Sequence, residues 1–124
     1  ESTYAQFAWG IEGELIPHQG NAFEVINETA SSLSINAKAT NIHTSDIFYR
    51  KDSGIPPVAE KYNCLAVEME AFALFANAKY LGKNAATILT VSDVIPTHEQ
   101  ISADERERAL KPMIELALES AIKL

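Results

Sequence analysis

Cysteine, long apolar runs and clustered positive charge are scarce in this sequence, and each scarcity excludes a class of protein. The single cysteine, Cys64, cannot form an internal disulfide, and its apolar neighbours predict a small, buried hydrophobic side chain. No apolar run approaches the roughly 20 residues that a membrane-spanning helix needs. Seventeen acidic residues outnumber ten basic ones and no basic block exists, so we expect neither nucleic acid nor a membrane as a partner.

Signals for cofactor binding and for targeting are also missing. His18, His43 and His98 are widely spaced and lack the pattern of a metal site. The five glycines are scattered and form no phosphate-binding loop. Residues 1–4 have neither the basic nor the apolar part of a signal peptide. We therefore expect a cytoplasmic protein without a metal or an organic cofactor.

The residues that are present predict an α/β fold over residues 1–124, as a single domain or a partial domain. An apolar content of 47% is enough for a globular core. Apolar runs predict strands, while helical spacing, capping residues and the position of Gly82 predict helices. The expected strands are residues 3–9, 35–40, 47–49, 64–67 and 85–91, and the expected helices are residues 21–33, 58–61, 69–81, 103–110 and 112–122. Their alternation predicts a layered sheet with flanking helices.

The helical segments carry more specific expectations. Asn21 with Glu24, and Ser102 with Glu105, have the N-cap and N3 chemistry of helix starts. Pro112 lacks a backbone donor and is expected to kink the last helix into two segments. The apolar stripe expected along that helix consists of Ala109, Leu110, Met113, Ile114, Ala117 and Ala121.

Carboxylates follow two of the expected strands directly. Glu68 and Glu70 come after the strand at residues 64–67, and Ser92-Asp93 follows the strand at residues 85–91. Ligands of open α/β sheets bind at the carboxyl ends of parallel strands, which favours a functional role for these side chains. The alternative is that Glu68 and Glu70 only cap the next helix and that Asp93 only starts a turn.

Arg106 is the most informative positive charge. It lies in the first turns of a predicted helix, where a cation opposes the helix dipole. One interpretation is a surface arginine paired with Asp104 or Glu107, which contributes little to stability. The other is an arginine directed at Asp93, whose loop leads into this helix.

In combination, these residues resemble a known family. Val67-Glu68-Met69-Glu70-Ala71, Thr90-Val91-Ser92-Asp93, Thr97-His98-Glu99-Gln100 and Glu105-Arg106 are similar in order and spacing to motifs of bacterial purine nucleoside phosphorylase of the hexameric type. Ser45-Asp46-Ile47-Phe48-Tyr49 resembles its base-pocket strand. The similarity runs from residue 30 to the end. Related nucleosidases that cleave methylthioadenosine share the first two motifs, whereas the last two favour the phosphorylase.

The resemblance implies a role for each matching residue. Asp93 would donate a proton to purine N7 as the glycosidic bond breaks, and Arg106 would move toward Asp93 to assist. Aspartate is ionised at neutral pH, so an acid role implies a partly desolvated pocket. Glu70 would bind ribose hydroxyls and Met69 would pack under the sugar. The base would be held by Phe48, Tyr49 and Val67, with Ser92 near it and Glu68 close to the site.

The resemblance covers only the C-terminal half of the family domain. The family binds its co-substrate, phosphate, with arginines of its N-terminal half, and here Arg50, Arg106 and Arg108 lie in no phosphate-binding motif. A half-sheet exposes apolar edges, so we expect a homo-oligomer, and the family implies a hexamer built as a trimer of dimers. A water-using nucleosidase and a non-catalytic nucleoside-binding fragment remain alternatives. The choice between 6-amino and 6-oxo purines stays open.

Overall fold

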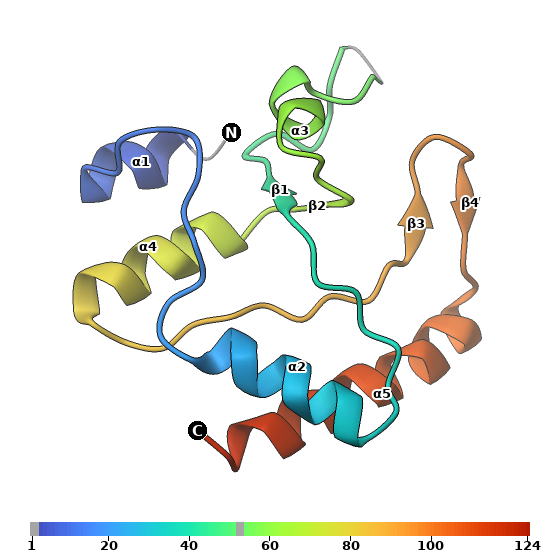
Figure 1. The fold of residues 1–124 in the computed structure, drawn as a ribbon. Helices are drawn as coiled ribbons and strands as arrows, with labels where there is room; N and C mark the ends of the chain where they lie inside the picture. Colours follow the sequence, from blue (N-terminus) through green and yellow to red (C-terminus); the bar gives the residue numbers. More distant parts are fainter. Residues whose placement is uncertain (1–2, 52–53) are drawn as a thin grey trace. The chain divides into compact units, whose positions relative to one another are not determined.

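The computed structural model describes residues 3–51 and 54–124, which belong to two compact units (Figure 1). The first unit takes in residues 1–20 and 38–86, and the second takes in residues 21–37 and 87–124. The prediction of a mixed α/β chain is confirmed. The described strands form two separate two-stranded sheets, so the single layered sheet is not seen here.

The first unit contains a parallel pair of strands. Strand β1 (Ile42–Thr44) pairs with β2 (Ala66–Glu68), and Thr44 stands opposite Glu68 in the register. Helix α3 (Pro57–Lys61) lies in the connection between them. The strand expected at residues 64–67 is therefore confirmed with its bounds shifted toward the carboxyl end.

Two other strand predictions, at residues 35–40 and 47–49, are wrong. Residues 35–40 are irregular, and the strand begins only at Ile42. Residues 47–49 form a bend because the Ile47 N–H donates to the Ser45 hydroxyl at 3.1 Å and turns the chain. In both cases a short apolar run resembled a strand, but no neighbouring strand forms a ladder with it.

Helix α1 (Thr3–Trp9) occupies the segment that we expected to be a strand. The aromatic residues suggested a strand, but alanine and glutamine between them favour a helix. Trp9 also finds a helical partner: its ring lies 4.5 Å from that of Tyr80 on α4 (Ala71–Leu81). Figure 1 shows the two helices side by side. Residues 3–9 thus form a helix that packs against α4.

Helix α4 was predicted over residues 69–81 and is confirmed with a start two residues later. Ala71, Phe72, Ala76 and Ala78 are its buried residues. It ends as expected at Gly82, which adopts the left-handed conformation (φ 62°) that glycine reaches without strain. The Lys83 N–H then bonds back to the Ala78 carbonyl at 2.9 Å.

The strand expected at residues 85–91 is absent from the described structure. Ala85 forms only an isolated antiparallel bridge with Gln19. The chain approaches closely here, because a Cβ at Gly20 would lie 1.6 Å from the Asn84 Oδ1. Residues 86–91 have the mainly apolar sequence of a strand, but no described strand pairs with them. A strand forms only with a hydrogen-bonded partner, and within the described residues the single bridge from Ala85 to Gln19 is the only such pairing of this segment.

The second unit consists of two packed helices and a hairpin. Helix α2 (Ala22–Ser32) packs on α5 (Ala103–Ala121), as Figure 1 shows. Strands β3 (Asp93–Val94) and β4 (Glu99–Gln100) form an antiparallel hairpin that the sequence did not predict. In the described part of the chain, no helix combines the length and apolar character needed to cross a membrane.

Helix α5 corrects two predictions. It runs through Pro112 as one helix instead of two, because a proline removes only one backbone hydrogen bond and neighbouring turns can continue. Its buried residues are Leu116 and Ser120, whereas Ile114 of the expected stripe is 50% exposed. The start of α2 is also corrected: Asn21 precedes the helix, but its side chain makes no capping hydrogen bond.

The capping box at the start of α5 is confirmed. The Ser102 hydroxyl accepts from the Glu105 N–H, and the Glu105 carboxylate accepts from the Ser102 N–H at 2.8 Å. The Ser102 hydroxyl also donates to the Glu105 carboxylate at 2.7 Å, and this bond, together with the one from the Ser102 N–H, holds the pKa of Glu105 below its usual value. The box therefore stabilises the helix above the unfolded-state pKa, and its contribution is lost as the pH falls through the folded-state pKa.

Replacing Ser102 by Ala is expected to lower the free energy of unfolding by about 1 kcal/mol at neutral pH, because a capping hydroxyl is lost. Urea unfolding followed by circular dichroism measures the change. The matched control is Ser31→Ala, since the exposed Ser31 hydroxyl bonds only to a carbonyl within its own helix at 2.9 Å. Equal losses in the two variants at neutral pH, or a Ser102 effect that grows toward acid pH, would contradict the capping explanation.

Candidate functional site

The carboxyl ends of β1 and β2 bring together residues that lie far apart in the sequence. Thr44 ends β1 and Glu68 ends β2, side by side in parallel register. The chain after β1 continues into Phe48 and Tyr49, and the chain after β2 continues into Met69 and Glu70. This edge of a parallel pair is where open α/β sheets bind ligands.

Both oxygens of the Glu68 carboxylate accept hydrogen bonds, one from the start of α4 and the other from β1. Its Oε2 accepts from the Glu70 N–H at 2.7 Å and from the Ala71 N–H at 2.6 Å. Its Oε1 accepts from the hydroxyl of Thr44, which in turn accepts from the Phe72 N–H at 3.1 Å. A carboxylate at the positive end of a helix dipole is favourable. Glu68 therefore caps the start of α4.

Glu70 behaves differently from Glu68. It occupies the N-cap position of α4, but its side chain makes no capping bond and is exposed. One of its oxygens accepts from the Met69 N–H at 3.1 Å. Met69 and Val67 beside it are 38% and 45% exposed. The surface here thus combines a solvent-facing carboxylate with accessible apolar side chains.

The loop after β1 presents an aromatic pair. Phe48 and Tyr49 meet edge to face, with ring centroids 5.0 Å apart. They are 75% and 91% exposed, so they stand on the surface and enclose no pocket by themselves. Ser45, which is buried, sets their position through the turn that it closes with Ile47. Exposed aromatic faces of this kind can stack on a planar ring.

The second unit holds the remaining predicted site residues. Asp93 begins β3 opposite Gln100 and is exposed, and the Ser92 hydroxyl donates to its Oδ2. The Ile101 N–H donates to the Ser92 carbonyl at 3.2 Å and closes the base of the hairpin. Asp93 therefore lacks the desolvated pocket that an acid role implies, and another molecule would have to cover it.

Arg106 lies on the first turns of α5, as predicted. Its backbone N–H donates to the Ser102 carbonyl at 2.8 Å, and the residue is exposed. Within residues 3–51 and 54–124, no ion pair joins its guanidinium to Asp93, although both belong to the second unit. The predicted approach of the two side chains is not present in this conformation.

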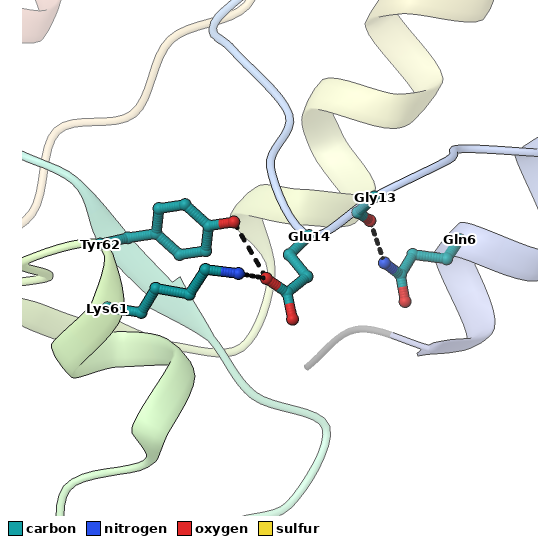
Figure 2. Close-up of polar contacts among 5 residues, drawn as sticks. All are labelled: Gln6, Gly13, Glu14, Lys61 and Tyr62. Atoms are coloured by element: carbon teal, nitrogen blue, oxygen red, sulfur yellow. Dashed lines mark hydrogen bonds and ion pairs between the residues drawn. The ribbon is translucent and has the colours of Figure 1, made fainter.

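An exposed ionic cluster lies elsewhere in the first unit. Figure 2 shows the Glu14 carboxylate accepting from the Lys61 ammonium at 2.7 Å and from the Tyr62 hydroxyl at 2.9 Å. These two hydrogen bonds lower the pKa of Glu14. Gln6 donates to the Gly13 carbonyl in the same view. The contacts of Glu14 with Lys61 and Tyr62 join the segment before Gly20 to the end of α3, and we assign this cluster a structural role.

Cys64 and the possible metal ligands were also considered in the sequence. Cys64 is half-buried rather than buried, and burial raises the pKa of its thiol. A raised pKa leaves less of the reactive thiolate at neutral pH. Among the described residues, no group of three or more histidine, cysteine, aspartate and glutamate side chains is placed to hold a metal ion.

The predicted site residues divide between the two units. The first unit contains the base- and sugar-binding candidates Phe48, Tyr49, Val67, Glu68, Met69 and Glu70, and the second contains Ser92, Asp93 and Arg106. Sequence reasoning missed Thr44, because its partner lies 24 residues away and no local spacing indicates the contact. No protein-family model matches this sequence.

Proposed function

We propose that this chain carries the base- and ribose-binding residues of a purine nucleoside phosphorylase of the bacterial hexameric type, with the layered α/β fold of that family. The observation that supports it best is the edge of the β1–β2 pair, where an exposed carboxylate, Glu70, and an exposed aromatic pair, Phe48 and Tyr49, follow adjacent parallel strands. A nucleoside offers hydroxyls for the first and a planar base for the second.

Each substrate-binding residue has a proposed task. Glu70 accepts hydrogen bonds from ribose hydroxyls, and Met69 packs under the sugar. Phe48, Tyr49 and Val67 line the purine, which stacks on aromatic faces. The Ser92 hydroxyl donates to Asp93 and orients that carboxylate.

The proposed reaction transfers the ribosyl group from purine to phosphate. A phosphate oxygen forms a bond to ribose C1′ as the C1′–N9 bond breaks, and the bonding electron pair leaves with the purine. Asp93 donates a proton to N7, so the purine leaves as a neutral base. General acid catalysis of this kind contributes about 10²–10⁴-fold. Arg106 stabilises the resulting Asp93 carboxylate when it approaches.

The proposed reaction also needs a phosphate site, which we place in a homo-oligomer. Arg50, Arg106 and Arg108 lie in no phosphate-binding motif, so we assign phosphate binding to residues supplied by another polypeptide segment in a homo-oligomer. Exposed apolar side chains on both units, such as Phe7 and Ile122, suit association with other chains. No nucleic acid, metal or organic cofactor takes part.

The experiment that tests the proposal measures base release from adenosine and inosine by this chain, with and without phosphate, at matched protein concentration. Phosphate-dependent release supports the phosphorylase. Base release at the same rate with and without phosphate identifies a nucleosidase. Absence of turnover with nucleoside protection against heating identifies a binding fragment, and absence of both refutes the proposal. Asp104→Asn, a change at another exposed aspartate, is the control that should behave like the unmodified chain.

A further inference from the structure

We propose that Thr44 is a positioning residue for the sugar subsite, because its hydroxyl and the Glu68 carboxylate together fix the backbone that presents Met69 and Glu70. The identity of the ligand in this inference rests on the proposed function. The contacts of Thr44 with Glu68 and Phe72, on which the inference is based, lie within this chain and can be tested without any ligand.

The Thr44 hydroxyl connects three elements of the first unit. The residue is 7% exposed and ends β1 opposite Glu68, the last residue of β2. Its hydroxyl donates to the Glu68 Oε1 and accepts from the Phe72 N–H of α4 at 3.1 Å. One buried oxygen therefore links both strands to the first turn of the helix.

The two glutamates consequently have different tasks. Thr44 occupies one oxygen of Glu68, and the N–H groups of Glu70 and Ala71 occupy the other. A carboxylate engaged in this way has little capacity left for sugar hydroxyls. Glu70 is exposed, and among the described contacts its carboxylate accepts only from the adjacent Met69 N–H. We therefore assign sugar recognition to Glu70 and positioning to Glu68 with Thr44.

Removal of the Thr44 hydroxyl should loosen this arrangement selectively. Thr44→Val keeps the shape of the side chain but leaves the Phe72 N–H and one Glu68 oxygen without this partner, and buried polar groups resist that loss. The backbone at residues 69–70 is then less well held, which weakens sugar binding. The aromatic pair Phe48–Tyr49 is set by the Ser45 turn and keeps its contact with the base.

The test compares three variants of the full chain: Thr44→Val, Thr44→Ser and Thr40→Val. Calorimetry measures the affinity for inosine and for the free base hypoxanthine, and NMR measures hydrogen exchange at the Ala71 and Phe72 amides. Thr44→Val should weaken inosine binding by about tenfold and speed exchange at both amides by a similar factor. Hypoxanthine affinity should stay within about twofold. Thr44→Ser should restore all values.

Thr40→Val is the matched control, since Thr40 is exposed and bonds only weakly, at 3.3 Å, to a neighbouring carbonyl. Unchanged inosine affinity in Thr44→Val, or equal losses for inosine and hypoxanthine, would overturn the positioning role. If the unmodified chain binds no inosine, the proposed function fails, while amide exchange still decides whether Thr44 holds α4. If Thr44→Val does not fold, unprotected Ala71 and Phe72 amides in the unmodified chain would overturn the inference, and protected ones would support it.

Discussion

Replacing Asp93 by Asn is expected to slow phosphate-dependent release of adenine from adenosine by about 10²–10⁴-fold. Asparagine keeps the shape of the side chain and can still accept from the Ser92 hydroxyl, but its amide N–H is too weak an acid to transfer a proton to N7. The purine must then leave as an anion, which is a poor leaving group. The rate of base release at saturating adenosine measures the loss.

A substrate that needs no proton separates this role from general damage. In 7-methylguanosine the N7 atom is already alkylated and the base is already a good leaving group. The Asp93→Asn variant should therefore release 7-methylguanine at nearly the original rate. Equal losses on adenosine and on 7-methylguanosine would show that Asp93 does not act as the acid, and Asp104→Asn should leave both rates unchanged.

Replacing Leu116 by Ala is expected to lower the free energy of unfolding by about 2–5 kcal/mol. Leu116 is 1% exposed on the face of α5 that packs in the second unit with α2. Truncation removes buried apolar surface and leaves a cavity that the surrounding side chains fill only in part. Urea unfolding followed by the helical circular-dichroism signal measures the change.

Leu118 provides the matched control, because the same helix carries it with 64% of its surface exposed. Leu118→Ala should alter the free energy of unfolding by no more than about 0.5 kcal/mol. Similar losses at the two positions would mean that Leu118 is buried in solution by an oligomer contact. A small loss at Leu116 alone would mean that the α2–α5 packing contributes little to stability.

Features that depend on neighbouring residues could be predicted from the sequence. The capping box of Ser102 and Glu105 closes within one turn, and Gly82 ends α4 because its own backbone reaches the left-handed region. The strand before Glu68 was also located, with its bounds shifted by about one to two residues, as is usual for element ends. Each of these features has its physical cause inside a few residues of chain.

Features that depend on distant partners were predicted wrongly or missed. Residues 3–9 carry the aromatics of a strand but form α1, where the Trp9 ring contacts that of Tyr80. Residues 85–91 have the composition of a buried strand but find no ladder among the described strands. The inner face of α5 follows Leu116 and not Ile114, because the position of α2 decides which side is covered.

At the candidate site, the residue types could be predicted from local sequence, but the separate contacts of Glu68 and Glu70 follow from the folding of distant segments. The order of Glu68, Met69 and Glu70 after an apolar run already indicated carboxylates at a strand end. Only the folded chain shows that Glu68 is engaged by Thr44 and by the first amides of α4, while Glu70 faces solvent. A hydrogen bond between residues 24 positions apart depends on the parallel pairing of β1 and β2, and no local pattern encodes that pairing.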